Sequence, residues 1–372
     1  MLARKLIPAA VSGAVGPSPT YAEDVFASYL FVGTGSSRSI VNGIDLAAEG
    51  GMVWSKNLNN SVNASIYDSG RGVQQYITSK DSNAQATVTT GLTAFNSDGF
   101  DVGGHVGSND GGARMVSWTF RKAPGFFDVV TYTGDGSSNR SIAHGLDSVP
   151  GMIFVKRLDS NSDWVVYHRS KGTAYAALNL TNGFASSSSR WPAAPSATDF
   201  RVGSHSSVNN NGSTFVAYLF AHDDARFGPG GDEPITAAGS YAGNSNTDGP
   251  TVNLGWEPQW LMIKRNGSSN WIVFDIARLM PTDLGYRYVS VNLANAENSS
   301  DNYYLKTTAT GFQILTDEDL LNSEETDYVY FAIRRGDKRP ASGSDFFQAR
   351  TRTGTSAADN TSSANFRADL AL

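Results

Sequence analysis

Gly51-Met-Val-Trp-Ser-Lys56 is the first copy of a pattern that returns as Gly151-Met-Ile-Phe-Val-Lys156 and Gln259-Trp-Leu-Met-Ile-Lys264. The lysines that close the three copies therefore recur at nearly equal intervals along the chain. A second pattern recurs at similar intervals, as Val116-Ser-Trp-Thr-Phe120, Val216-Ala-Tyr-Leu-Phe220 and Val329-Tyr-Phe-Ala-Ile333. Self-similarity at a fixed spacing identifies repeated structural units. The 372-residue chain therefore contains three units, each close to the length of a single β-sandwich, about 100 residues.

The repeated segments are strand-like. Asp128-Val-Val-Thr-Tyr-Thr133 and Phe215-Val-Ala-Tyr-Leu-Phe220 are β-branched or aromatic runs, and turn residues separate such runs throughout the chain. Several runs are apolar at odd and even positions alike, which suits strands at the centre of a two-layer sandwich better than an exposed hairpin. Periodicity alone does not distinguish runs this short from buried helix. We expect an all-β chain, a tandem array of about three β-sandwich domains of the jelly-roll or lectin-like kind, arranged as beads on a string. The only helix expected is one or two turns within Thr316–Glu325.

Clusters of Gly and Pro mark the boundaries between units. An extended N-terminal docking arm is predicted at 1–24, and Arg4, Lys5, Leu6 and Ile7 are its candidate contact residues. The rest of the chain divides into repeat 1 at 25–122, repeat 2 at 126–225, repeat 3 at 234–340, and a C-terminal tail at 341–372 that resembles the start of a fourth repeat.

Composition and charge exclude several classes of function. The net charge of −6 lacks the positive field that nucleic acid requires, so no nucleic-acid partner is expected. The absence of cysteine excludes disulfides and thiolate sites. No apolar run reaches about 18 residues, so no membrane insertion is expected. The segment Met1–Gly16 is too weakly hydrophobic, with Pro8 inside it, to be interpreted as a signal peptide.

No pattern in the sequence identifies a catalytic, metal or cofactor site. The five histidines lack the local spacing of a ligand set, and no Gly-x-Ser-x-Gly elbow occurs. The densest acidic cluster, Asp317-Glu-Asp319 with Glu324-Glu325, could supply acid and base groups or bind Ca²⁺, but a solvated loop is the preferred interpretation. The recurring lysines are interpreted as charges that guard sheet edges. We therefore expect no catalytic, cofactor or metal residues and no enzyme activity.

Carbohydrate binding is the most plausible chemistry for the loops, because exposed aromatic rings stack on sugars beside amide and hydroxyl groups. Trp191, in Ser189-Arg-Trp-Pro192, and Trp256, in Gly255-Trp-Glu-Pro258, are the candidates for glycan contact. The competing interpretation is that Trp191 caps its own sandwich, because large aromatic side chains are more often buried than exposed.

Ten further segments are informative when taken together: Ser12-Gly13, Asp24-Val-Phe26, Asn42-Gly-Ile-Asp-Leu46, Ser117-Trp-Thr-Phe-Arg-Lys-Ala-Pro124, Phe127-Asp-Val-Val-Thr-Tyr-Thr-Gly134, His144-Gly-Leu146, Pro150-Gly-Met152, Val155-Lys-Arg157, Trp164-Val-Val-Tyr-His-Arg169 and Ala332-Ile-Arg-Arg-Gly336. They resemble a repeat family common in structural proteins of tailed bacteriophages, especially marine ones, and the likeness spans about residues 20–345, nearly the whole chain.

The resemblance implies a structural protein of the virion, assembled in the host cytoplasm, with other virion proteins and host surface polysaccharide as partners. A tail fibre, receptor-binding protein or tail-associated appendage is the first expectation, and a capsid decoration protein or head fibre is the alternative. A glycan-degrading tailspike is the second alternative. Analogy with such appendages suggests a homo-oligomer, specifically a trimer.

Overall fold

Three six-stranded sheets, one from each repeat, form the framework of the computed structural model, which describes residues 20–278, 280, 286–300 and 304–336. Every strand pair in them is antiparallel, so the expectation of an all-β chain is confirmed. In spatial order, the sheet of unit 1 contains β1 (Phe26–Val32), β9 (Arg114–Arg121), β3 (Gly51–Asn57), β4 (Ser65–Asp68), β5 (Gln75–Thr78) and β6 (Ala86–Thr87).

Units 2 and 3 repeat this strand order. The sheet of unit 2 contains β10 (Phe127–Thr133), β17 (Thr214–Ala221), β12 (Pro150–Arg157), β13 (Val165–His168), β14 (Ala174–Ala176) and β15 (Ala185–Ser186). The sheet of unit 3 contains β20 (Thr236–Ala242), β28 (Asp327–Arg334), β22 (Pro258–Arg265), β23 (Trp271–Asp275), β24 (Tyr286–Ser290) and β25 (Asn298–Ser300).

A smaller sheet accompanies each large one. These are β2 (Arg38–Val41), β8 (Gly99–Val102) and β7 (Leu92–Asn96) in unit 1, β11 (Arg140–Ala143) and β16 (Asp199–Val202) in unit 2, and β21 (Thr251–Asn253), β27 (Gly311–Ile314) and β26 (Leu305–Thr308) in unit 3. A two-stranded sheet of β18 (Ala225–Phe227) and β19 (Glu233–Pro234) joins units 2 and 3. The helices are single turns: α1 (Ala22–Val25), α2 (Val106–Asn109), α3 (Ser206–Asn209), α4 (Asp319–Asn322), η1 (Arg169–Lys171) and η2 (Ile276–Arg278).

The central strands are apolar on both faces because each face covers a different core. In β12, Ile153 and Val155 face a core that belongs to unit 2 alone. Met152 and Phe154, which alternate with them, point the other way into a core that all three units share. The same alternation in β3 and β22 gives units 1 and 3 their own cores as well.

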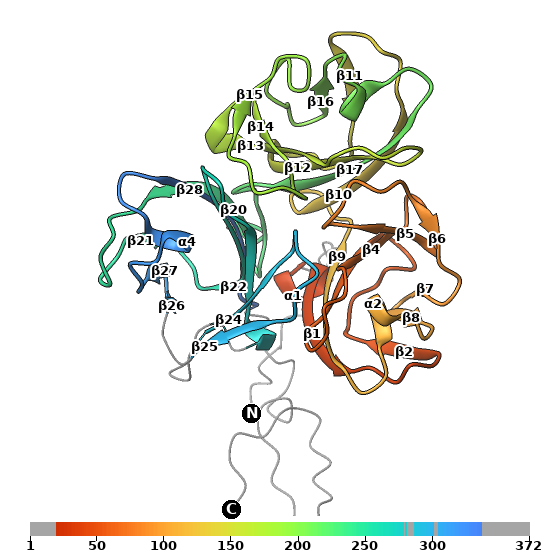
Figure 1. The fold of residues 1–372 in the computed structure, drawn as a ribbon, viewed down its shortest axis with the longest axis horizontal. Coiled ribbons are helices and arrows are strands. Elements are labelled where there is room, and N and C mark those ends of the chain that lie inside the picture. The colour runs from red at the N-terminus through yellow and green to blue at the C-terminus, as the bar shows by residue number, and fades with distance from the viewer. Residues whose placement is uncertain (1–19, 279, 281–285, 301–303, 337–372) are drawn as a thin grey trace, which may run out of the picture.

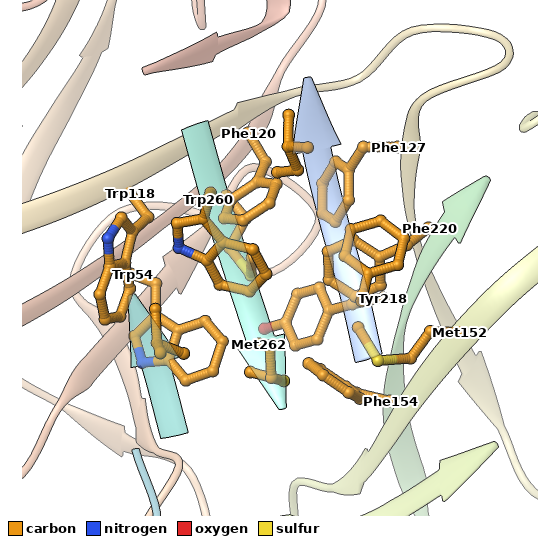
Figure 2. Close-up of a cluster of buried hydrophobic side chains, with 14 of the residues drawn as sticks. Trp54, Trp118, Phe120, Phe127, Met152, Phe154, Tyr218, Phe220, Trp260 and Met262 are labelled. Atoms are coloured by element: carbon orange, nitrogen blue, oxygen red, sulfur yellow. The ribbon is translucent and has the colours of Figure 1, made fainter. Parts of the chain in front are cut away.

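The expectation of beads on a string is wrong, because the three units surround one common core (Figure 1). Figure 2 shows its aromatic centre, where side chains from units 1, 2 and 3 meet. The Phe120 ring of unit 1 lies 5.6 Å from Phe220 of unit 2 and 6.0 Å from Trp260 of unit 3, between ring centroids. A large sheet with two apolar faces must bury both, and one small sheet covers only one of them. The second face is buried by the neighbouring units.

The chain enters and leaves each unit at the same end of this common core. The first residue of each entering strand pairs with a residue at the end of the leaving strand, as Phe26 with Phe120 and Phe127 with Phe220. The carbonyl of Thr20 accepts a hydrogen bond of 2.9 Å from the N–H of Gly228, in the linker between units 2 and 3. Both linkers and the first described residue therefore lie together, at what we call the linker end. The opposite end, where β3, β12 and β22 finish, we call the loop end.

Candidate functional site

The three recurring lysines are fully buried at the loop end, so the prediction that they guard sheet edges is wrong. Each ammonium donates hydrogen bonds to three backbone carbonyls, one of which belongs to a neighbouring unit. The acceptors are Asn57, Val62 and Ala294 for Lys56, Arg157, Ser162 and Ser82 for Lys156, and Arg265, Gly267 and Thr181 for Lys264, at 2.7 to 3.1 Å.

These cross-unit bonds follow a cyclic order. Lys56 of unit 1 reaches unit 3, Lys264 of unit 3 reaches unit 2, and Lys156 of unit 2 reaches unit 1. Burial lowers the pKa of all three ammonium groups to about 8. Three carbonyls satisfy the three N–H donors of an ammonium group, which is how a charged lysine is accommodated in the interior. The lysines close the three units into a ring.

A second set of equivalent residues connects the units deeper in the core. Asp68 Oδ2, at the end of β4, accepts a 2.6 Å hydrogen bond from the Tyr218 hydroxyl of unit 2. Asp275 Oδ2, at the end of β23, accepts a 2.8 Å bond from Trp118 Nε1 of unit 1. Each aspartate also forms a buried ion pair within its own unit, with Arg71 at 2.5 Å or with Arg278 at 2.6 Å. Each carboxylate thus links its own unit to a neighbour.

Unit 2 carries His168 where the other two units carry aspartate. The residue that would face it, Phe331, has no polar group, and His168 Nε2 instead lies 3.0 Å from the carbonyl oxygen of Tyr330. A carbonyl only accepts, so Nε2 carries the proton, while Nδ1 accepts from the N–H of Ser170. Burial lowers the pKa of His168 to about 4, which keeps the ring neutral at pH 7. An aspartate here would be a buried charge that receives no hydrogen bond from Phe331 across the interface.

A repeated buried asparagine that the sequence reasoning missed holds the first loop of each unit. The side chain of Asn109 accepts from Thr34 N and donates to the carbonyls of Ser36 and Gly103. Asn209 and Asn322 make the corresponding bonds in units 2 and 3. Aligning Ser108-Asn109 with Val208-Asn209 and Leu321-Asn322 would have found this position.

The two tryptophans predicted to contact glycan are buried, so that prediction is corrected. The exposed fractions of Trp191 and Trp256 are 1% and 6%, and neither ring has an open face for a sugar. Trp191 fills the position of Leu92 in unit 1, and Trp256 fills that of Ile44. The sister units show that these positions belong to the core of each unit. Comparing Asn42-Gly-Ile44 with Leu254-Gly-Trp256 would have indicated this.

Two of the histidines and the acidic cluster lie at the helical turns α2, α3 and α4, where their contacts are those of ordinary loop residues. His105 and His205 precede the helical turns α2 and α3, and His205 Nδ1 accepts from the N–H of Ser207. Glu318 takes this position in unit 3, before α4, a single turn within Thr316–Glu325, where one or two helical turns are predicted. Asp319 forms an exposed 3.3 Å ion pair with Arg265. Across the described ranges, no group of three His, Asp or Glu side chains is arranged to hold a metal ion.

One pocket of about 720 Å³ opens on the surface of unit 2, beside unit 3. The guanidinium of Arg190 lies over the Tyr175 ring, 3.9 Å from its centroid, at the wall of this pocket. Asp163, Asn182 and His205 line it as well. Its volume is in the range of small-molecule sites, and its lining combines one cation with carboxylate, amide and hydroxyl groups.

The predicted docking residues Arg4, Lys5, Leu6 and Ile7, and the tail at 341–372, lie outside the described residues. No helix in the described part of the chain is long and apolar enough to cross a membrane.

One family model, described as a domain of unknown function (DUF7483), matches residues 21–335 and so spans all three units. No curated protein matches the chain.

Proposed function

The chain belongs to the DUF7483 family of unknown function, and we propose that it is a non-enzymatic structural protein of a bacteriophage particle. In this proposal it is a tail fibre, receptor-binding protein or tail-associated appendage that docks through its N-terminal arm. Other virion proteins are its docking partners, and host surface polysaccharide is the ligand that its β units present.

The proposal rests on one observation, namely which groups the buried polar residues bind. The three buried lysines, the buried aspartates and His168 all bind backbone or side-chain groups of a neighbouring unit. Interactions of this kind hold a ring rigid and leave their donors and acceptors unavailable for substrate. A rigid body of this design suits a particle component that must keep its shape outside the cell.

The linker end supports docking through the arm. Thr20, the first described residue, is bound to Gly228 at this end of the common core. Gly336, the last described residue, lies so close to Glu23 that a Cβ placed on it would overlap the Glu23 side chain. The segments beyond both residues therefore start on one side of the ring. Docking there would direct the loop end away from the particle.

We also propose that each unit is a β-sandwich of the jelly-roll or lectin-like kind. A six-stranded sheet and a smaller sheet enclose a separate core in each unit, as the cores around Phe100, Phe200 and Phe312 illustrate. A trimer of the whole chain is proposed by analogy with phage appendages alone.

Imaging of the particle tests the proposal. We expect antibody against the loop end to label purified particles, with density on the tail. Density at capsomer centres would favour the alternative of a capsid decoration protein or head fibre. Release of defined oligosaccharides from host polysaccharide by the purified chain would favour the second alternative, a glycan-degrading tailspike. A protein absent from purified particles would contradict the proposal as a whole.

A further inference from the structure

Each unit carries one partly buried tyrosine at the same place in its sheet, and the residue that lies against the ring differs from unit to unit. These tyrosines are Tyr76, Tyr175 and Tyr288. Each directly precedes a residue, Ile77, Ala176 or Val289, that pairs with the neighbouring strand β4, β13 or β23. In unit 1 the ring of His105 lies against Tyr76, 5.2 Å between centroids. In unit 3 Tyr304 lies 6.2 Å from Tyr288. In unit 2 the cover is the guanidinium of Arg190.

The position of Arg190 is occupied by a different residue type in each unit, as equivalent backbone hydrogen bonds show. The Arg190 carbonyl accepts a hydrogen bond from the N–H of Gly203. In the same way the Gly91 carbonyl accepts from the N–H of Gly103, and the Tyr304 carbonyl accepts from the N–H of Leu315. A Cβ added to Gly91 would overlap the hydroxyl of Tyr67, so unit 1 has no room for a side chain there. The fold therefore accepts glycine, arginine or tyrosine, and the ring of units does not require a cation at this position.

Arg190 is held in place with most of its donors unused. The guanidinium lies over the Tyr175 ring, 3.9 Å from its centroid, and Nη1 donates one 3.2 Å hydrogen bond to Ser187 Oγ, so two contacts restrain it. Within the described residues this is the only hydrogen bond from the side chain, and Nε is buried without a partner. A fixed guanidinium with free Nη hydrogens matches the two oxygens of a carboxylate.

The rest of the pocket offers partners for hydroxyl groups. The carboxylate of Asp163 is exposed and receives one hydrogen bond of 2.8 Å, from Asn179 Nδ2, which leaves acceptor positions free. Asn161, Asn182 and Ser206 are exposed at its wall. A volume of about 720 Å³ admits one or two sugar rings. One cation, one carboxylate and several amide and hydroxyl groups favour a ligand with few charges and several hydroxyls.

We propose that this pocket binds a carboxylated glycan, with the sugar carboxylate on Arg190 and sugar hydroxyls on Asp163 and the neighbouring amides. The choice of a glycan rests on the proposed function, whereas the choice of a carboxylate rests on Arg190 alone. The site belongs to unit 2, because units 1 and 3 carry no cation at the equivalent position.

Calorimetric titration of the full chain tests the site, using short oligomers of galacturonate, glucuronate and mannuronate, and sialyllactose, as probes. We expect at least one acidic oligosaccharide to bind at least about tenfold more tightly than its methyl ester, because esterification removes the charge that pairs with arginine. The Arg190→Gln variant is expected to lose this preference. Equal affinity for acid and ester, or no binding of any probe with a Kd below about 10 mM, would overturn the proposal.

Two further variants separate loss of the site from loss of the fold. Arg190→Tyr introduces the residue that unit 3 carries at this position, and it should remove acid binding while the thermal melt stays unchanged. Arg201→Gln removes a half-exposed arginine of the same unit outside the pocket, and it should bind as the wild type does. Binding that Arg190→Tyr leaves intact would contradict the proposal. Particle imaging tests the proposed function independently of these titrations. If the protein is found on particles but binds no acidic glycan, the proposed site is wrong and the proposed function is unaffected.

Discussion

Trp118 Nε1 of unit 1 donates a 2.8 Å hydrogen bond to Asp275 Oδ2 of unit 3, and both side chains are fully buried. Asp275 Oδ2 also accepts a hydrogen bond from Arg278 Nε of its own unit, so the indole adds a donor from the neighbouring unit to a buried carboxylate. A hydrogen bond to a charged group in this setting contributes about 1.5–3 kcal/mol.

The Trp118→Phe variant should therefore lose more stability than a matched tryptophan variant of the same core. Trp54 is equally buried, packs edge-on against Trp118 at 5.4 Å, and its Nε1 has no hydrogen-bond partner in the described structure. Trp54→Phe removes a similar volume and no hydrogen bond. Urea denaturation should show Trp118→Phe to be less stable by about 1–3 kcal/mol. Equal losses in the two variants would mean that the cross-unit bond contributes nothing.

Removal of one buried lysine should weaken the whole ring. Lys156→Met leaves three carbonyls without their donor, at Ser82, Arg157 and Ser162. We expect a loss of about 2–4 kcal/mol in the free energy of unfolding, since a buried polar group that loses its partner costs about 1–3 kcal/mol. Lys306→Met, at an exposed lysine, is the control and should change stability by less than about 0.5 kcal/mol. A melt of Lys156→Met that coincides with the control would show that the ammonium is dispensable.

Acid should weaken the interface between units 2 and 3 through His168. The folded protein holds the pKa of this imidazole at about 4, below the usual 6.5, because it is buried. Between these values the unfolded chain binds a proton that the folded chain does not, so stability falls as the pH drops from 6.5 to 4. Below pH 4 both states are protonated and the His168 contribution levels off.

Comparison with His168→Gln isolates this contribution, because glutamine keeps a donor for the Tyr330 carbonyl and does not titrate. The variant should lose less stability than the wild type between pH 6.5 and 4, measured by chemical denaturation at each pH. His222 has its pKa lowered to about 4 as well, so His222→Gln serves as the parallel comparison. Identical pH profiles for wild type and His168→Gln would contradict the assignment.

Deletion of residues 1–19 should separate docking from folding. The described units begin at Thr20, and no hydrogen bond of the ring described above requires an earlier residue. The deleted protein should melt as the full chain does, by differential scanning calorimetry, and should fail to enter particles. Deletion of 337–372 is the matched truncation at the other end. Particles that still incorporate the protein without its N-terminal segment would place the docking site elsewhere.

The sequence predicted the strands and the repeats well, because both leave local signals. Met152, Phe154 and their neighbours in β12 form an apolar run with a regular spacing to its copies, which identifies a buried strand in each unit. The same run does not indicate what covers the second face of the strand. Side chains of the other two units cover it, among them Trp54 and Trp260, and no local sequence pattern predicts such a contact.

The candidate site was harder to predict for the same reason. The sequence around Lys56 is typical of a surface charge. Its burial depends on Ala294 of unit 3, which is distant in the sequence and whose carbonyl is one of its hydrogen-bond acceptors. Trp191 looks like a loop residue because Arg190 and Pro192 flank it, although the core of unit 2 encloses it. The pocket depends on the stack of Arg190 on Tyr175, which come from different segments of unit 2.

The cyclic order of the lysine contacts fixes the number of repeats. In an open array each repeat contacts only its neighbours, so a copy can be added or lost at an end without breaking the contacts among the others. Here unit 1 reaches unit 3, unit 3 reaches unit 2 and unit 2 reaches unit 1, so neither end of the series is free. A two-unit version of the ring would expose the aromatic centre, and a fourth unit inserted into the ring would have to break one of the three cross-unit lysine contacts. Loss or insertion of a whole repeat would therefore remove cross-unit contacts, whereas substitutions on the outer surface of each unit leave them in place.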